Sequence, residues 1–266
     1  MLPLAGESFP TTADELAAAL QSGFETRGLV PHQITIEGKE YPELTQVSVD
    51  LTGGKITREN RPVDTAAKTG ASSFLEIAQL ELFGEPVYFE QTALEIRVEA
   101  EQVKMRVAGH PGNGSLMLES AAAGKISVKI THEALEDLLR SLVSGAAAKQ
   151  GLEVKETKLD LEQDGARGVA FRAEVTAKVF IMNATLALTG RLDIDDAFNA
   201  RLSALALDGD SMVVNLAGSF LRPRLQALEG RVFPLLAFSP GGLKLRDIEL
   251  SVSPSLQVHA RFGGPA

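Results

Sequence analysis

The stretch Val169–Ile194, VAFRAEVTAKVFIMNATLALTGRLDI, decides the fold class of this chain. Its first half carries apolar side chains at odd positions and mostly polar ones at even positions, which is typical of a strand with one buried face. From Met182 onward the apolar positions are even, and this alternation continues to Ile194. We predict one long strand of about 25 residues at roughly 3.3 Å per residue. A bulge at Ile181 and Met182 would bend it.

Similar alternation predicts strands on both sides of this stretch. Within 74–107 the apolar parity changes near residues 99–102, which predicts a turn or a bulge there. Asp164-Gly165 is a hairpin signal, and residues 195–199 are a polar turn. The other expected strands are 34–36, 47–51, 116–118, 125–130, 155–162, 202–207, 243–252 and 256–262.

Three amphipathic helices are expected among the strands. The first covers 11–28, where Thr12 and Glu15 form a capping-box pattern. The second begins at Thr131 and carries one apolar stripe. The third covers about 215–236 and is interrupted by two prolines. With a polar loop at about 53–73, this order predicts a single α+β domain, 1–266, with an antiparallel sheet.

Composition excludes several classes of function. The chain has 266 residues, a net charge of −9 and no cysteine. A nucleic-acid partner is not expected, because phosphate binding needs a basic surface. The sequence shows neither a transmembrane segment nor a signal peptide. The compartment therefore stays open: cell envelope if a leader has been removed, and cytoplasm otherwise.

The sequence offers no recognisable catalytic or metal-binding motif. The four histidines are scattered, and neither a G-x-S-x-G elbow nor a P-loop is present. The acidic run Asp193–Asp196 lacks the glycine and glutamate that an EF-hand would require. We therefore expect no catalytic residue, no metal, no cofactor and no enzymatic activity.

Three arginines, Arg222, Arg224 and Arg231, accompany the apolar residues of the third expected helix. One interpretation is that they contact phosphate headgroups at the mouth of an apolar groove. The other is that they form a solvated face and lie over the core with their aliphatic stems. The sequence leaves both interpretations open.

The order of elements resembles a known family. The segments that carry the resemblance are ITHEALEDLL at 130–139, a β-region at 153–207, FLRPRLQAL at 220–228 and GLKLRDIEL at 242–250. Together they resemble the LmeA-like phospholipid-binding family of bacteria, whose domains look like tubular lipid-binding (TULIP, BPI-like) modules. The resemblance covers about residues 30–262 and consists of apolar spacing patterns rather than invariant catalytic residues.

The resemblance implies a long, highly curved antiparallel β-sheet wrapped around amphipathic helices, with acyl chains held in an apolar groove between them. Its expected ligand is a lipid or fatty acid, with peripheral contact to a membrane. Small residues such as Ala173 and Gly190 would leave room beside larger ones, although the sequence does not decide whether helices fill that room. The groove candidates are Phe171, Val175, Val179, Leu186, Leu188, Phe220, Leu221, Leu225, Leu228 and Phe233, and the headgroup candidates are Arg222, Arg224 and Arg231.

A second hypothesis needs no small ligand. The same apolar strip would bind a protein partner or close a dimer, and the protein would then be a non-catalytic structural or interaction protein. The sequence does not determine the oligomeric state. A third hypothesis, an enzyme with an unrecognised site, would require two buried carboxylates in a cleft.

Overall fold

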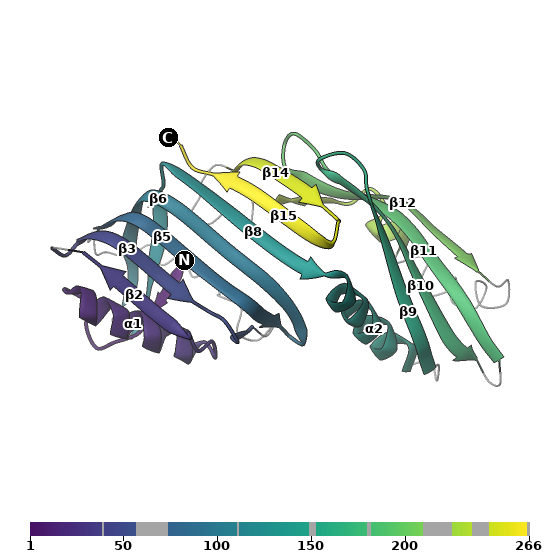
Figure 1. Cartoon of the computed structure of the whole chain (residues 1–266), viewed down its shortest axis with the longest axis horizontal. Helices are drawn as coiled ribbons and strands as arrows, with labels where there is room; N and C mark the ends of the chain where they lie inside the picture. The colour runs from purple at the N-terminus through teal and green to yellow at the C-terminus, as the bar shows by residue number, and fades with distance from the viewer. Residues whose placement is uncertain are drawn as a thin grey trace. The chain divides into compact units, whose positions relative to one another are not determined.

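The computed structural model describes residues 1–38, 40–56, 74–110, 112–148, 153–179, 182–209, 225–235 and 245–264. Strands account for 64% of these residues and helices for 16%, and neither sheet closes on itself. Figure 1 shows the long, twisted strands that dominate the chain. The α+β content with extensive antiparallel sheets is as the sequence predicts.

The described chain divides into two compact units. Unit 1 consists of Met1–Lys129, Phe238–Asp247 and Val258–Ala266, and unit 2 consists of Ile130–Ala237 and Ile248–Gln257. The expectation of a single domain stays a prediction, because compactness does not decide whether the units fold independently.

The larger sheet has ten strands and is mostly antiparallel. Its main order is β14-β15-β8-β6-β5-β3-β2, with β7 paired to β6 and to β1. Two pairs, β3 with β5 and β4 with β5, are parallel, which the sequence did not predict. The bounds are β1 (Leu2–Leu4), β2 (Gln33–Glu37), β3 (Glu43–Asp50), β4 (Lys55–Ile56), β5 (Phe74–Phe89), β6 (Thr92–His110), β7 (Asn113–Ser120), β8 (Ala123–Thr131), β14 (Leu245–Ser251) and β15 (Ser255–Phe262).

The parity change predicted near residues 99–102 lies within one continuous strand, β6. Glu101 and Gln102 are both exposed, as are Ala78 and Gln79 on β5, where Gln79 lies opposite Glu101; Gln102 has a φ of 48°. Since both strands are irregular at the same place, their pairing register does not shift. Buried residues on both sides of the irregularity consequently belong to one hydrophobic cluster. The expected turn is absent from β6, and the local distortion takes its place.

Unit 1 has a sealed core closed by the first helix, α1 (Ala13–Thr26). Thr12 caps this helix by accepting a hydrogen bond from the Glu15 amide at 3.2 Å, as the capping-box pattern predicts. Leu16 and Leu20 are fully buried, and the Ala5 amide donates to the Ala19 carbonyl at 2.9 Å. The largest fully buried side chains among the described residues all belong to unit 1: Leu16, Leu20, Val47, Val49, Leu75, Ile77, Val87, Val103, Met105, Val107 and Leu116.

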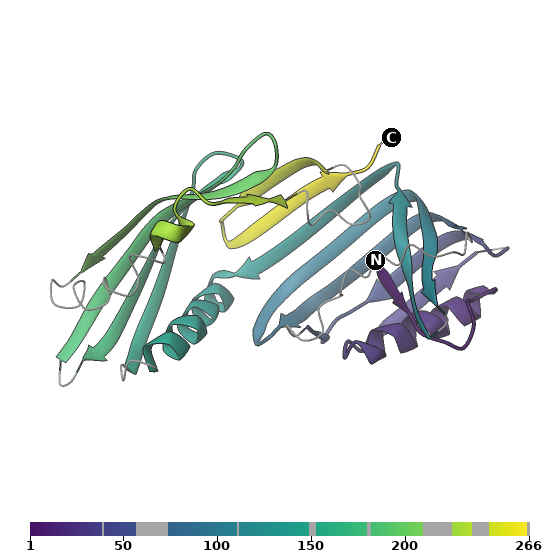
Figure 2. The same ribbon diagram turned by 180° about the vertical axis from the view of Figure 1, so that it is seen from behind.

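Unit 2 contains a five-stranded antiparallel sheet in the order β13-β12-β11-β10-β9. Helix α2 (His132–Ala148) precedes it, and the Thr131 hydroxyl accepts a hydrogen bond from the Ala134 amide at 3.2 Å. Figures 1 and 2 show α2 running alongside β9. The strands are β9 (Glu153–Gln163), β10 (Gly168–Val179), β11 (Met182–Ile194), β12 (Asn199–Gly209) and β13 (Val232–Pro234).

The prediction of one bent strand across 169–194 is wrong. The stretch forms two antiparallel neighbours, β10 and β11, paired from Gly168 with Asp193 to Val179 with Met182. In this register every odd residue of β10 lies opposite an even residue of β11. When the chain reverses between two such strands, the apolar positions change from odd to even, and a bulge in a single strand causes the same change. No glycine, proline or asparagine at 180–181 signalled a turn.

The third expected helix is only partly present. The described part contains a short helix at 225–228, followed by β13 where a helix was predicted. The correction has a physical reason, because β13 pairs with β12, with Phe233 opposite Ala200. Such cross-strand pairing overrides the helical spacing of the apolar residues. Of the predicted helix, residues 215–224 and 236 lie outside the described residues.

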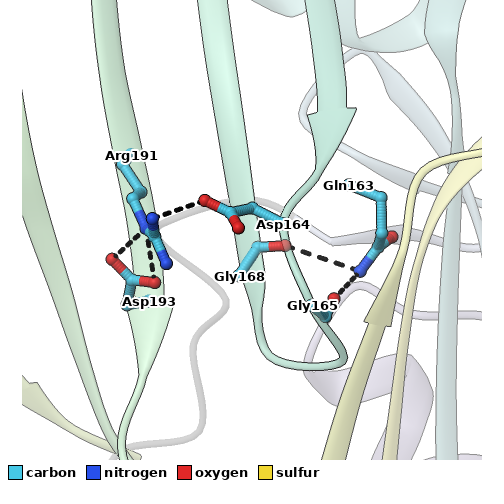
Figure 3. A network of polar contacts seen from close by, with 6 residues as sticks. All are labelled: Gln163, Asp164, Gly165, Gly168, Arg191 and Asp193. Atoms are coloured by element: carbon cyan, nitrogen blue, oxygen red, sulfur yellow. Dashed lines mark hydrogen bonds and ion pairs between the residues drawn. The ribbon is translucent and has the colours of Figure 1, made fainter.

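Polar contacts fix one end of the unit 2 sheet. The hairpin between β9 and β10 forms at Asp164-Gly165, as predicted, and Arg191 on β11 forms ion pairs with Asp164 and Asp193 (Figure 3). The Gln163 side chain donates to the Gly165 and Gly168 carbonyls in the same view. These contacts hold the turn against the neighbouring strand.

The same hairpin also binds β14. The Gln163 amide nitrogen donates to the Leu250 carbonyl at 2.9 Å, and the Leu250 amide donates to the Ala166 carbonyl at 2.7 Å. The Arg167 guanidinium donates to the Ile248 carbonyl at 3.1 Å. Ile248 and Leu250 are buried. The closing hairpin of the chain thus covers this end of the sheet.

Candidate functional site

One face of the unit 2 sheet is apolar across four strands. The register places Phe171 opposite Gly190, Ala173 opposite Leu188 and Val175 opposite Leu186. The opposite face carries the polar residues of the same strands, including a contact between the Thr176 and Thr185 hydroxyls at 3.1 Å. We name the first surface the unit 2 apolar face; it comprises Leu159, Leu161, Val169, Phe171, Ala173, Val175, Ala184, Leu186, Leu188, Gly190, Leu192, Leu202 and Leu207.

This face is only partly covered. Phe171, Val175, Leu186 and Leu188 are all half-buried. Among the described residues of unit 2, the only buried apolar side chains larger than alanine are Val169, Ile194, Ile248 and Leu250. Val169 and Ile194 lie near the end of the sheet that β14 covers. Solvent therefore reaches the large apolar side chains over the rest of the face.

Gly190 does not leave a void. A Cβ added to Gly190 would lie 2.5 Å from Cζ of Phe171 and 2.6 Å from Cδ2 of Leu205. The Phe171 ring and the Leu205 side chain already occupy this space. The expectation that Gly190 leaves room beside Phe171 is therefore wrong, since the large side chain packs over the small one.

Helix α2 covers the outer edge of β9. The Glu136 carboxylate accepts a hydrogen bond from the Leu159 amide at 3.0 Å, and the Glu136 carbonyl accepts one from the Thr157 hydroxyl at 3.4 Å. A free strand edge presents unpaired amides, and these contacts satisfy one of them. The apolar stripe of α2 is itself half-buried at Leu135, Leu138, Leu139 and Val143.

The 225–230 segment is anchored to β12. The Glu229 carboxylate accepts hydrogen bonds from the Ala204 and Leu205 amides, both at 2.9 Å. Ala204 has a φ of 53° and lies where the register of β11 and β12 shifts. The anchor therefore satisfies two amides that the irregular strand presents. Leu225 and Leu228 of this segment are half-buried.

Next to this anchor, Arg231 directly precedes β13 and Phe233 lies on it. The Arg231 guanidinium carbon is 5.1 Å from the centre of the Phe233 ring, a cation–π contact. Arg231 is exposed, and Phe233 is half-buried on β13. Of the three headgroup candidates, Arg231 is the one that the structure describes.

The structure describes the groove candidates unevenly. It brings Phe171, Val175, Leu186 and Leu188 together on one face, and Val179 ends β10 opposite Met182. Leu225, Leu228 and Phe233 follow on the segment that borders β12. Outside the described residues lie Phe220, Leu221, Arg222 and Arg224.

The sequence interpretation missed several members of the apolar face. Leu161, Leu192, Leu202 and Leu207 lie directly opposite named candidates or their neighbours. Each belongs to an alternating strand, so the signal was present in the sequence. The pairing register, which the sequence did not provide, was needed to place them on this face.

The described residues show neither a metal-binding cluster nor a membrane-spanning helix. Within the described ranges, no group of three or more histidine or acidic side chains could hold a metal ion. Nor does any described helix combine the length and apolar character needed to cross a bilayer.

The comparisons with known proteins found no match for this chain. No protein-family model matches the chain, and no curated protein and no solved structure matches it. The resemblance to the LmeA-like family stays a prediction based on apolar spacing.

Proposed function

We propose that this protein binds a lipid or fatty acid, whose acyl chain lies on the unit 2 apolar face. The observation that carries the proposal is the partial exposure of Phe171, Val175, Leu186 and Leu188 on one sheet face. Burying such side chains is worth about 1.5–3 kcal/mol each, and unit 1 shows that this chain can seal a core. These side chains are already half-buried, so a covering ligand would recover only the part of that free energy that belongs to their remaining exposed surface.

The dimensions and chemistry of the face suit an acyl chain. β10 has twelve residues and β11 thirteen, which corresponds to a length of roughly 40 Å at about 3.3 Å per residue. The face carries apolar side chains along this length and offers no charged group to a polar ligand. At its border, the exposed Arg231 offers a guanidinium to a phosphate or carboxylate headgroup. The proposed arrangement is an apolar groove with a cationic border, as in a TULIP-like module.

A matched pair of variants tests the proposal. Val175→Glu places a carboxylate on the apolar face, whereas Thr176→Glu places it on the opposite face of the same strand. We expect Val175→Glu to weaken binding of a fluorescent fatty acid at least about tenfold, because a charge on an apolar contact surface must be desolvated. Thr176→Glu should retain wild-type affinity. Far-UV circular dichroism and melting temperature show whether both variants fold.

Native mass spectrometry of protein purified under gentle conditions provides the second test. Bound lipid mass is expected with the wild type and should be lost from Val175→Glu. A lipid-free wild-type spectrum together with no uptake of the fluorescent fatty acid would overturn the proposal. If light scattering then showed a dimer that Val175→Glu dissociates, the apolar face would instead be a protein-interaction surface.

A further inference from the structure

Unit 1 carries a hollow on its sheet that is separate from the unit 2 apolar face. Its volume is about 510 Å³, which lies within the range of small-molecule sites. Strands β3, β5, β6, β8, β14 and β15 all contribute to its lining. Its lining includes the small residues Ala122, Ala123 and Gly124. The Phe262 ring occupies the space above Gly124, where a Cβ would lie 2.2 Å from it.

Carboxylates gather on one side of the hollow. Glu81 lies directly opposite Glu99, and Gln79 directly opposite Glu101, in the pairing of β5 with β6. Like charges in directly opposed positions destabilise a sheet. Arg97 partly offsets this repulsion, since its Nη1 is 3.1 Å from Glu81 and 3.7 Å from Glu99. No described residue forms an ion pair with Glu101.

Cations gather on the other side. Lys125 on β8 lies opposite Glu99 in the register, yet among the described residues it forms no ion pair within 4.0 Å. Arg261 on β15 likewise has no acidic partner in the described part of the chain. Arg246 on β14 donates from Nε to the Gly263 carbonyl, so that its guanidinium is held in place. All three side chains are exposed.

The charges of opposite sign thus line one hollow without neutralising one another. We propose that this hollow binds a small zwitterion, a compound that carries an ammonium group and a carboxylate or phosphate group. The ammonium would lie against Glu99 and Glu101, and the anionic group against Arg246 and Arg261. A ligand with both charges relieves the carboxylate repulsion and supplies the missing partner for the cations. This inference does not depend on the lipid proposal.

Phosphoethanolamine is the probe, and its two halves are the controls. Isothermal titration calorimetry at low salt should show binding of phosphoethanolamine at least about tenfold tighter than of ethanolamine or inorganic phosphate, because only the whole compound makes both charge-assisted contacts. Equal affinity for the compound and for either half would overturn the proposal, as would absence of binding.

Variants assign the binding to the hollow. Glu101→Gln and Arg261→Gln should each weaken phosphoethanolamine binding about tenfold by removing one charge-assisted contact. Glu76→Gln is the matched control, because Glu76 lies on β5, the strand next to that of Glu101, but pairs with Lys104 at 2.7 Å and does not line the hollow. Unchanged affinity in both test variants, with their fold intact by circular dichroism, would overturn the assignment.

A vesicle experiment distinguishes the source of the zwitterion. Co-sedimentation with phosphatidylethanolamine vesicles that Arg261→Gln abolishes would identify a lipid headgroup as the ligand. Binding of free phosphoethanolamine without co-sedimentation would identify a soluble compound. The fatty-acid assay with Val175→Glu reports on unit 2 alone, so failure of the lipid proposal and failure of this one are distinguishable.

Discussion

At the residue scale, single side chains decide how the unit 2 sheet packs. Gly190 is the clearest case, because the space above it belongs to Phe171 and Leu205. Asp195 is another, because its carboxylate organises the turn between β11 and β12. The Asp195 carboxylate accepts hydrogen bonds from the Asn199 amide at 2.9 Å and from the Asn199 side chain at 3.1 Å. Each of these residues gives a prediction.

Replacing Gly190 should destabilise unit 2. Gly190→Ala introduces a Cβ 2.5 Å from the Phe171 ring, so that Phe171 must move. We expect the free energy of unfolding to fall by about 1–3 kcal/mol, measured by urea denaturation. Gly145→Ala in α2 is the control, because nothing lies within 4 Å of its added Cβ. That variant should instead gain about 0.5–1 kcal/mol. Equal effects would contradict the packing described for Phe171.

Asp195 should make stability depend on pH in the acid range. Hydrogen bonds from the Asn199 amide and then from its side chain hold the pKa of Asp195 below its ordinary value of 3.8. A carboxyl whose pKa is lower in the folded state stabilises the fold above its unfolded pKa, and this contribution is lost as pH falls through the folded pKa. The stability difference between wild type and Asp195→Asn should therefore be present at pH 7 and shrink below about pH 3.8.

Thermal unfolding followed from pH 2 to pH 7 measures this difference. A difference for Asp195→Asn that stays constant over this pH range would contradict the role of the Asp195 carboxylate.

At the element scale, the long strands and their edges show what alternation can predict. Alternation correctly indicated which side chains share a face in 169–194, since odd residues of β10 and even residues of β11 do lie together. It could not distinguish a bulge from a two-residue reversal, because both change the parity by one. In β6 a change of apolar parity instead marks a distortion within a continuous strand of 19 residues. The distinction depends on which strand is hydrogen-bonded to which, and that is a tertiary property.

The edge of β9 depends on a side chain of α2. Replacing Glu136 by alanine removes the acceptor of the Leu159 amide, which should lower the free energy of unfolding by about 1–2 kcal/mol. Hydrogen exchange of the Leu159 amide, measured by NMR, should accelerate in the same variant. Glu133→Ala is the control, because Glu133 is exposed in the first turn of α2. Unchanged exchange at Leu159 would contradict the edge contact.

At the scale of the whole molecule, the two units differ in how completely they bury their apolar side chains. Every one of the largest fully buried side chains among the described residues belongs to unit 1. The apolar side chains of unit 2 are mostly half-buried. Local stability follows the burial of apolar surface, so the units should differ in stability.

Hydrogen–deuterium exchange should therefore be faster in β10 and β11 than in β5 and β6. Saturating fatty acid should slow exchange in β10 and β11 and have little effect on the unit 1 strands, because a ligand stabilises the state to which it binds. Mass spectrometry of peptides from both units measures this in one experiment. Equal protection of the two units without ligand would contradict the difference in burial.

The sequence by itself determined the strand-rich α+β class, the first two helices with their caps, the turns at 164–165 and 195–199 and the two faces of each long strand. These features follow from local rules: periodicity, capping side chains and turn residues. Only the tertiary structure decided that 169–194 is a hairpin, that β3 and β5 run parallel, that β13 replaces a helix and that Phe171 fills the space at Gly190. Each of these depends on a partner distant in sequence, and a local pattern does not identify such a partner. The charged hollow of unit 1 has the same origin, since its carboxylates and cations come from five strands of one sheet.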